Sequence, residues 1–277
     1  MTERIVVLSG EGPHADPWHA FEATSAAVAG VLGDAGDVEV IGTDAVVADA
    51  SAAATAAEAS ADASAAPTAA ATAADAIRDA DLLVVNASAD LALPPGDSAS
   101  LVDLLVARHA AGRPILALHS SSLAFGDDPR WARLLGGRWV PGTSGHPQIG
   151  HALVQAAGSA ADLAPAAAPP CPGDFVLYDE RYTALECDAA NLVLAVHTED
   201  GLAHPIIWWR DVAEGAGAVA YDALGHGVES YESAPHAHWL RRAARRLLAT
   251  APAAAASVAP PGSRDAGLAS DASQEVA

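Results

Sequence analysis

Two histidines in this 277-residue chain stand in sequence surroundings that suit chemistry. His119 directly follows the apolar run Pro114–Leu118 and precedes three serines. A strand that runs into a tight turn of small residues is how a nucleophile elbow is built. His226 lies between two glycines, so the backbone there is tightly turned and the imidazole is prominent. Because histidine titrates near neutral pH, both rings are candidates for proton transfer.

The residues around His119 restrict the kind of nucleophile that this turn can carry. A hydrolase elbow has the pattern Gly-x-Ser-x-Gly, and both glycines are missing here. An amidotransferase elbow carries cysteine at the exposed position, where this chain has His119. Activated-cysteine chemistry is therefore excluded at this turn, while Ser120 stays open as an alternative nucleophile.

The elements that must position these histidines alternate between strand and helix. The apolar runs of the first half are short and continuous, as in strands buried on both faces. Their order predicts an α/β fold with a mostly parallel sheet and helices on both faces. Strands are expected at Ile5–Leu8, Val38–Ile41, Leu82–Val85, Pro114–Leu118, Ile149–Gln155, Leu192–Thr198, His204–Trp209 and Gly217–Tyr221, and helices at Trp18–Leu32, Asp97–Ala111 and Pro235–Leu248.

The carboxyl ends of such strands are the expected place for a ligand. The loops that follow the first, fourth and last parallel strands carry His14, His19, His119 and His226. We therefore expect His119 and His226, which are far apart along the chain, to converge at one edge of the sheet. Glu229 is close enough in sequence to orient His226.

The composition excludes several classes of protein. The 14 basic residues are all arginine and face 35 Asp+Glu, for a net charge of −21. The absence of lysine excludes Schiff-base and Walker-type phosphate chemistry, and the negative charge argues against nucleic-acid or anionic-membrane binding. The apolar runs are too short for a signal sequence or a membrane helix, and two cysteines are too few for a disulfide framework. We expect a cytoplasmic protein.

Two segments contain too few large apolar residues to build a core. Residues 45–76 have no Leu, Ile or aromatic residue, and residues 251–277 are small, polar and rich in proline. Such segments bury too little apolar surface to offset chain entropy. We expect a single domain over residues 1–250 with a partly helical surface insertion at 45–76, and a disordered tail at 251–277. Both segments should be removable with little loss of stability.

Five motifs in order resemble those of the ThuA-like, or trehalose-utilisation, family over residues 4–249, the insertion apart. The resemblance implies a flavodoxin-like fold similar to the class I glutamine amidotransferases. In that fold His119 would take the place of the nucleophilic cysteine and His226 that of the late-loop histidine. The motifs are Ile115–Ser121; Leu134-Leu135-Gly136-Gly137-Arg138-Trp139 followed by His146-Pro147; Asp179-Glu180-Arg181-Tyr182; His204-Pro205-Ile206-Ile207-Trp208; and Tyr221–Ser230.

The resemblance also implies a role in carbohydrate metabolism, on a sugar or an oxidised sugar. In the first hypothesis His119 and His226 transfer protons, Glu180 orients or assists them, and no cysteine nucleophile takes part. A neutral, carbohydrate-like ligand suits this acidic chain, and Trp18 or Trp208 could stack on its face. The residues expected to bind it are His14, Trp18, Asp179, Tyr182, His146, His204, Trp208, Glu229 and Ser230.

Two other hypotheses stay open at this point. His119, His226 and a third ligand such as His146 or Glu180 could bind a divalent metal such as zinc and serve a hydrolase or an isomerase. The chain has no His-x-x-x-His pair, so spacing neither favours nor forbids this metal site. Alternatively, the protein is a non-catalytic sugar-binding or interaction module that keeps the pocket without turnover.

Overall fold

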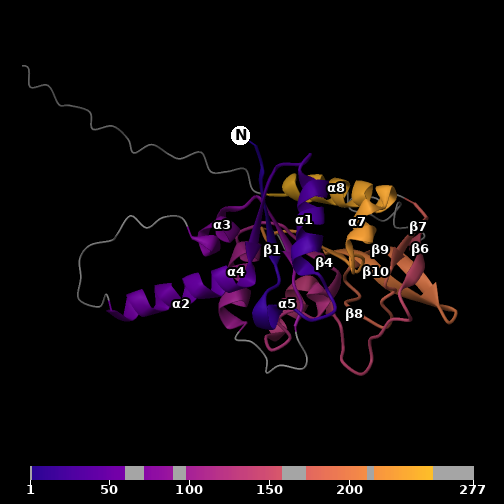
Figure 1. The fold of residues 1–277 in the computed structure, drawn as a ribbon, viewed down its shortest axis with the longest axis horizontal. Coiled ribbons are helices and arrows are strands. Elements are labelled where there is room, and N and C mark those ends of the chain that lie inside the picture. Colours follow the sequence, from indigo (N-terminus) through magenta and orange to yellow (C-terminus); the bar gives the residue numbers. More distant parts are fainter. Residues whose placement is uncertain (1, 60–71, 90–97, 158–172, 211–214, 252–277) are drawn as a thin grey trace, which may run out of the picture.

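The fold is a mixed β-sheet packed between helices. The structure is a computed structural model that describes residues 2–59, 72–89, 98–157, 173–210 and 215–251. For residues 53–59 it describes the backbone only. Within these residues the sheet has nine strands in the order β2-β1-β3-β4-β11-β10-β9-β6-β7 (Figure 1). The strands are β1 (Arg4–Ser9), β2 (Asp37–Gly42), β3 (Leu82–Asn86), β4 (Ile115–Leu118), β6 (Gly150–Ala156), β7 (Phe175–Asp179), β9 (Leu192–Glu199), β10 (Leu202–Arg210) and β11 (Val219–Asp222), and β5 (Gly137–Arg138) pairs separately with β8 (Glu186–Cys187).

The helices fall into two groups. α1, α7 and α8 pack against one another, and α8 lies on β3, β4 and β11. α4 contacts α2, α3 and α5, and Figure 1 shows α2 projecting away from the sheet. The helices are α1 (Phe21–Leu32), α2 (Thr43–Ala59), α3 (Ala73–Asp79), α4 (Ala99–Ala110), α5 (Pro129–Leu135), α7 (Val228–Glu232) and α8 (Ala234–Leu248), with 3₁₀ turns η1 (Gly12–His14) and η2 (His119–Ser122).

The two halves of the sheet differ in direction. Strands β2, β1, β3, β4 and β11 are parallel to one another, whereas β10, β9, β6 and β7 pair antiparallel. Every residue of β1, β3, β4 and β11 except Arg4 is buried, as the continuous apolar runs predict. The predicted α/β class is confirmed, in a sheet of which one half is parallel. The carboxyl ends of β1, β4 and β11 meet at one edge.

The first helix begins later than predicted. The sequence pattern places its start at Trp18, whereas α1 begins at Phe21. The carboxylate of Asp16 accepts the backbone N–H groups of Trp18, at 2.9 Å, and of His19, at 3.1 Å. This local turn competes with helix formation and ends the β1–α1 loop just after His19.

The expected insertion at 45–76 contacts the core at its start. Val46, on α2, is buried in the hydrophobic core. The Asp49 carboxylate accepts the backbone N–H groups of Ala73 and Ala74 at the beginning of α3. Deletion of the whole segment 45–76 would remove Val46 and Asp49, so the expectation that it costs little stability does not fit its first part. Residues 60–71 and 252–277 lie outside the described residues, and the tolerance of these two stretches to deletion stays a prediction.

Val46 offers a test of how far α2 stabilises the fold. We expect Val46→Ala to lower the free energy of unfolding by about 1–3 kcal/mol, because removal of two buried methyl groups leaves a cavity in the core. Val40→Ala is the matched control, since Val40 is 44% exposed, and it should change stability by less than about 0.5 kcal/mol. Urea denaturation measures both. Equal, small effects of the two substitutions would mean that α2 does not stabilise the core.

Candidate functional site

His119 sits at a strained turn at the end of β4. Its φ is +44°, in the left-handed region that non-glycine residues rarely adopt. The side chain is buried, and its Nδ1 lies 2.7 Å from the carbonyl oxygen of Ala223. A carbonyl can only accept, so Nδ1 carries the hydrogen and Nε2 presents a lone pair when the ring is neutral. Ser120 is also buried, with its hydroxyl directed to the carbonyl of Ala87.

His19, from the β1–α1 loop, faces His119. Both carboxylate oxygens of Asp16 lie 2.7 Å from His19 Nδ1, which places the hydrogen on that nitrogen. Burial lowers the pKa of His19 and outweighs the contact with Asp16, which favours the neutral ring. Its Nε2 lies 2.9 Å from the Nε2 of His119.

His226 completes the group of imidazoles from the loop after β11. Its ring centroid is 5.7 Å from that of His119 and 4.8 Å from that of His19. The carboxylate of Asp179 holds this loop by accepting the backbone N–H groups of Gly225, at 2.8 Å, and of His226, at 3.2 Å. Gly225 has a φ of +128°, and a Cβ there would collide with the hydroxyl of Tyr231.

Glu180 brings a carboxylate among these rings. Its Oε1 lies 3.2 Å from His226 Nδ1 and 3.5 Å from His146 Nε2, and its Oε2 lies 3.5 Å from His119 Nε2. Burial alone would raise the pKa of Glu180, but the hydrogen-bonding contacts with His119 and His226 outweigh it and hold the pKa well below its usual range. The same contact with Glu180 raises the pKa of His226.

These four side chains, His19, His119, Glu180 and His226, form the histidine cluster. One ligand atom from each lies within 4.8 Å of the others. The structure thus brings His119, His226 and Glu180 together, as the sequence analysis expected, while their roles stay predictions. The sequence analysis places His19 in a loop at this sheet edge but does not count it among the expected catalytic or binding residues. The signal that could have found it is the carboxylate three residues earlier, at Asp16, in a loop at the same sheet edge.

Tyr182 and His146 also lie at the cluster. The Tyr182 hydroxyl is 3.1 Å from His119 Nε2, and its ring stacks on that of His119 at a centroid distance of 4.6 Å. The side chain of His146 is 37% exposed, and its Nε2 lies 3.5 Å from Glu180. Trp139 packs edge-on against Tyr182 at 4.8 Å. These residues form one wall of the site.

Other expected binding residues lie elsewhere. The buried ring of His14 packs on Phe125 at 5.4 Å. His204 accepts the backbone N–H of Ala184 through Nδ1. Trp208 is fully buried and donates its indole N–H to the carbonyl of Leu135, so the expectation that it stacks on a ligand does not fit its position.

The remaining expected residues differ in their exposure. Trp18 is 65% exposed, one residue before His19. Glu229 is exposed on α7. Ser230 is buried, with its hydroxyl 3.0 Å from Nδ1 of His236. Of these three residues, Trp18 is the one with a large exposed ring.

Comparisons with known proteins agree with this architecture. The model of the ThuA family, described as trehalose utilisation, matches residues 4–245. Among the helices of the described residues, none is long and apolar enough to cross a membrane. The comparison with curated proteins gave no match.

Solved structures with a similar fold share little sequence identity with the chain. A ThuA-like protein from Parabacteroides merdae ATCC 43184 superposes with a TM-score of 0.61 at 12% identity, covering 89% of this chain and 90% of that chain. A ThuA-like protein from Bacteroides uniformis ATCC 8492 gives 0.57 at 14% identity, covering 89% and 91%. A protein of Salmonella typhimurium LT2 described as cytoplasmic gives 0.53 at 13% identity, covering 88% and 99%. Likenesses at this identity show the fold alone.

Proposed function

The chain belongs to the ThuA family, described as trehalose utilisation, and on that premise we propose that it is a metal-dependent enzyme of carbohydrate metabolism. The substrate is a neutral sugar or an oxidised sugar, which reacts at the histidine cluster. The metal is a divalent ion such as zinc. His19, His119 and His226 are its nitrogen ligands, and Glu180 supplies a carboxylate beside it.

One observation carries this proposal: the two Nε2 atoms of His19 and His119 face each other at 2.9 Å. Asp16 and the Ala223 carbonyl fix the hydrogens of both rings on Nδ1. Two neutral rings would therefore point lone pairs at each other, which is repulsive. A cation between them removes the repulsion, and a zinc ion bound by imidazole nitrogens at about 2.0–2.1 Å suits this pair.

The surroundings of the ligands support a metal site. Histidines that bind zinc donate their other ring N–H to a carboxylate or a backbone carbonyl, which orients the ring. Asp16 and Ala223 have these roles for His19 and His119. Three imidazole nitrogens are a common donor set for catalytic zinc and keep the fourth position open for substrate.

The cluster also supports a choice of substrate. Arg181, the arginine nearest to it in sequence, is held by Glu199 at 3.1 Å and by the carbonyl of His151. An ionised Glu180 would repel a phosphorylated sugar, so a neutral substrate suits the site. The bound ion would polarise a hydroxyl or carbonyl oxygen of the substrate. Glu180 would move the proton, and exposed Trp18 could stack on the sugar.

A second candidate is acid–base catalysis without a metal. In this case a proton takes the place of the metal ion and is shared between the Nε2 atoms of His19 and His119, which lie 2.9 Å apart. His226 and Glu180, at 3.2 Å, would then form the proton-transfer pair. The raised pKa of His226 favours its protonated form and so supports this alternative as well.

The two candidates are separated by measuring metal content and turnover on the same protein. We expect elemental analysis to find one divalent ion per chain after growth in zinc. The conversion of trehalose, oxidised trehalose and other neutral sugars would be followed by NMR. The measurement would be made before the metal is removed with a chelator, after its removal, and after zinc is restored. Turnover that is lost and regained supports the metal enzyme. Turnover without metal supports acid–base catalysis, and zinc binding without any turnover contradicts the enzymatic proposal.

Substitution of Asp179 tests whether metal binding requires the hydrogen bonds that position the His226 loop. We expect Asp179→Asn to weaken zinc binding by about 10–100-fold, as for other residues that orient metal ligands, because an amide can no longer accept from both Gly225 and His226. Competition with a chromogenic chelator measures the affinity. Glu229→Gln is the matched control and should leave it unchanged. Equal affinities for the three proteins would mean that Asp179 does not position His226.

A further inference from the structure

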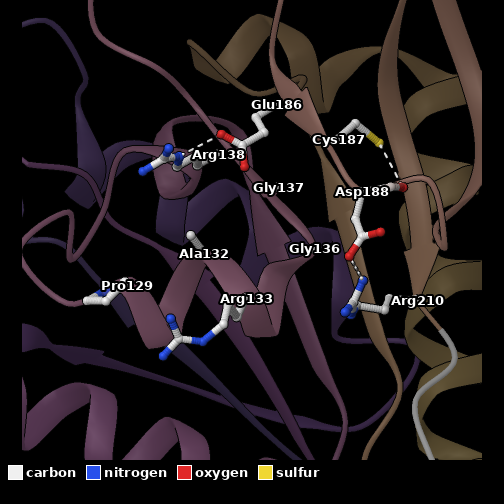
Figure 2. Close-up of a pocket in the computed structure, with 10 residues that line it drawn as sticks. All are labelled: Pro129, Ala132, Arg133, Gly136, Gly137, Arg138, Glu186, Cys187, Asp188 and Arg210. Atoms are coloured by element: carbon white, nitrogen blue, oxygen red, sulfur yellow. Dashed lines mark hydrogen bonds and ion pairs between the residues drawn. The ribbon is translucent and has the colours of Figure 1, made fainter.

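A second polar site lies in a groove of 530 Å³ between α5 and the β5–β8 ribbon (Figure 2). We call it the arginine groove, because Arg133, Arg138 and Arg210 line it together with the acids Glu186 and Asp188. The excess of arginine is local, since the chain as a whole carries a net charge of −21. At physiological ionic strength charges act over about 8 Å, so the nearby guanidinium groups decide which ligands the groove accepts.

Arg133 is the guanidinium available for a new partner. It is exposed on α5 and, among the described residues, it makes no hydrogen bond or ion pair and acts on Asp128 only through its charge. Figure 2 shows its guanidinium and that of Arg138 on either side of Ala132, whose small side chain leaves the space between them open.

The other two arginines differ in how firmly they are held. Arg138 donates to Glu186 at 2.9 Å, but these side chains are 52% and 58% exposed, so the pair is weak and Arg138 can turn to a ligand. Arg210 donates to Asp188 and to the Asn191 side chain, at 3.1 and 3.0 Å. Arg210 is therefore a fixed part of the wall.

We infer that the arginine groove binds a small oxyanion, a phosphate monoester or a carboxylate carried on a sugar-sized body. Arg133 and Arg138 would donate hydrogen bonds to its oxygens, since the planar guanidinium group can form two parallel hydrogen bonds with a phosphate or a carboxylate. The volume lies within the range of small-molecule sites. The inference does not depend on the proposed function, because none of the lining residues belongs to the histidine cluster.

The arginine groove is separated from the histidine cluster by two packed rings. The backbone of Gly137, at the groove, lies directly against the indole of Trp208. Trp208 packs on Tyr221 at 4.2 Å, and the Tyr221 hydroxyl donates to the backbone carbonyl of His119 at 2.8 Å. Binding in the groove and metal binding at the cluster can thus be measured separately.

Calorimetric titration of the full chain tests the inference, with glucose 6-phosphate and gluconate as probes and glucose as the neutral control. We expect saturable binding of at least one anion, weakened more than tenfold by Arg133→Gln and by Arg138→Gln. Arg245→Gln removes the same charge at an exposed position of α8 and should leave binding unchanged. Zinc content should be the same in all four proteins.

The probe that binds identifies the kind of oxyanion, since glucose 6-phosphate reports a phosphate monoester and gluconate a carboxylate. Binding of neither anion would overturn the inference. Equal weakening by Arg245→Gln would overturn it as well, because the probe would then respond to overall charge rather than to the groove. Thermal melts of the variants verify that each is folded.

Discussion

His119→Ala is expected to reduce zinc from one ion per chain to almost none and to lower turnover by more than about 100-fold. The substitution removes the lone pair that faces His19 at 2.9 Å, and loss of a direct ligand costs at least as much affinity as loss of an orienting partner, about 10–100-fold. Elemental analysis and chelator competition measure the loss. His19→Ala should have an effect of similar size, although the sequence analysis did not place His19 in the site.

His151→Ala is the matched control for these substitutions. His151 is exposed on β6 and packs edge-on against Tyr178, at 5.9 Å, away from the cluster. Its removal should change neither zinc content nor turnover. If His119→Ala kept one tightly bound zinc per chain, the metal site would be wrong. Loss of turnover with unchanged zinc would shift the role of His119 to proton transfer.

The convergence of His119 and His226 could be predicted because of a property of parallel sheets. Each residue follows a fully buried strand, and parallel neighbours such as β4 and β11 end at the same edge. Glu180 could be found only through its family motif. It follows β7, an edge strand of the antiparallel half, whose place in the sheet depends on long-range pairing that no local pattern encodes.

Trp208 and His19 show two ways in which the position of a residue differs from what its sequence pattern suggests. Trp208 occurs in a motif of the family, but β10 lies in the middle of the sheet, so its indole packs inside the protein. His19 stands at the expected sheet edge but not among the expected site residues, because apolar periodicity extends the predicted helix back to Trp18, whereas Asp16 holds that segment in a turn. Competition between a side-chain hydrogen bond and a helix is local, yet composition and periodicity do not report it.

Ser230 shows a third such difference, in which a residue of a family motif belongs to a buried hydrogen-bond network. Its hydroxyl lies 3.0 Å from Nδ1 of His236, whose Nε2 lies 3.0 Å from the carboxylate of Asp222. The order resembles a serine–histidine–aspartate triad, but the side chains of Asp222 and His236 are 0% exposed, so no substrate reaches them. Trp239 donates its indole N–H to the same carboxylate at 2.8 Å. The network therefore anchors α8 to β11.

Asp222→Asn should accordingly destabilise the fold, by about 3–5 kcal/mol at pH 5.5, because removal of one partner leaves a buried charge without compensation. Burial alone would lower the pKa of His236, but the attraction to Asp222 outweighs it and raises the pKa above 6.5. A raised pKa in the folded state contributes stability that is fully present below pH 6.5 and is lost as the pH rises through the folded-state value. The difference in the free energy of unfolding between the wild type and Asp222→Asn should therefore become smaller toward pH 9.

Urea denaturation at pH 5.5 and pH 9 measures this gap, with Asp200→Asn as control because Asp200 is exposed in the turn between β9 and β10. The control should stay within about 0.5 kcal/mol of the wild type at both values of pH. A gap that does not change with pH would mean that His236 is neutral in the fold and that only hydrogen bonding to Asp222 matters. A stability difference that becomes smaller with rising pH requires a charged pair of His236 and Asp222 inside the protein. This pair connects α8 to β11, the strand that precedes the His226 loop.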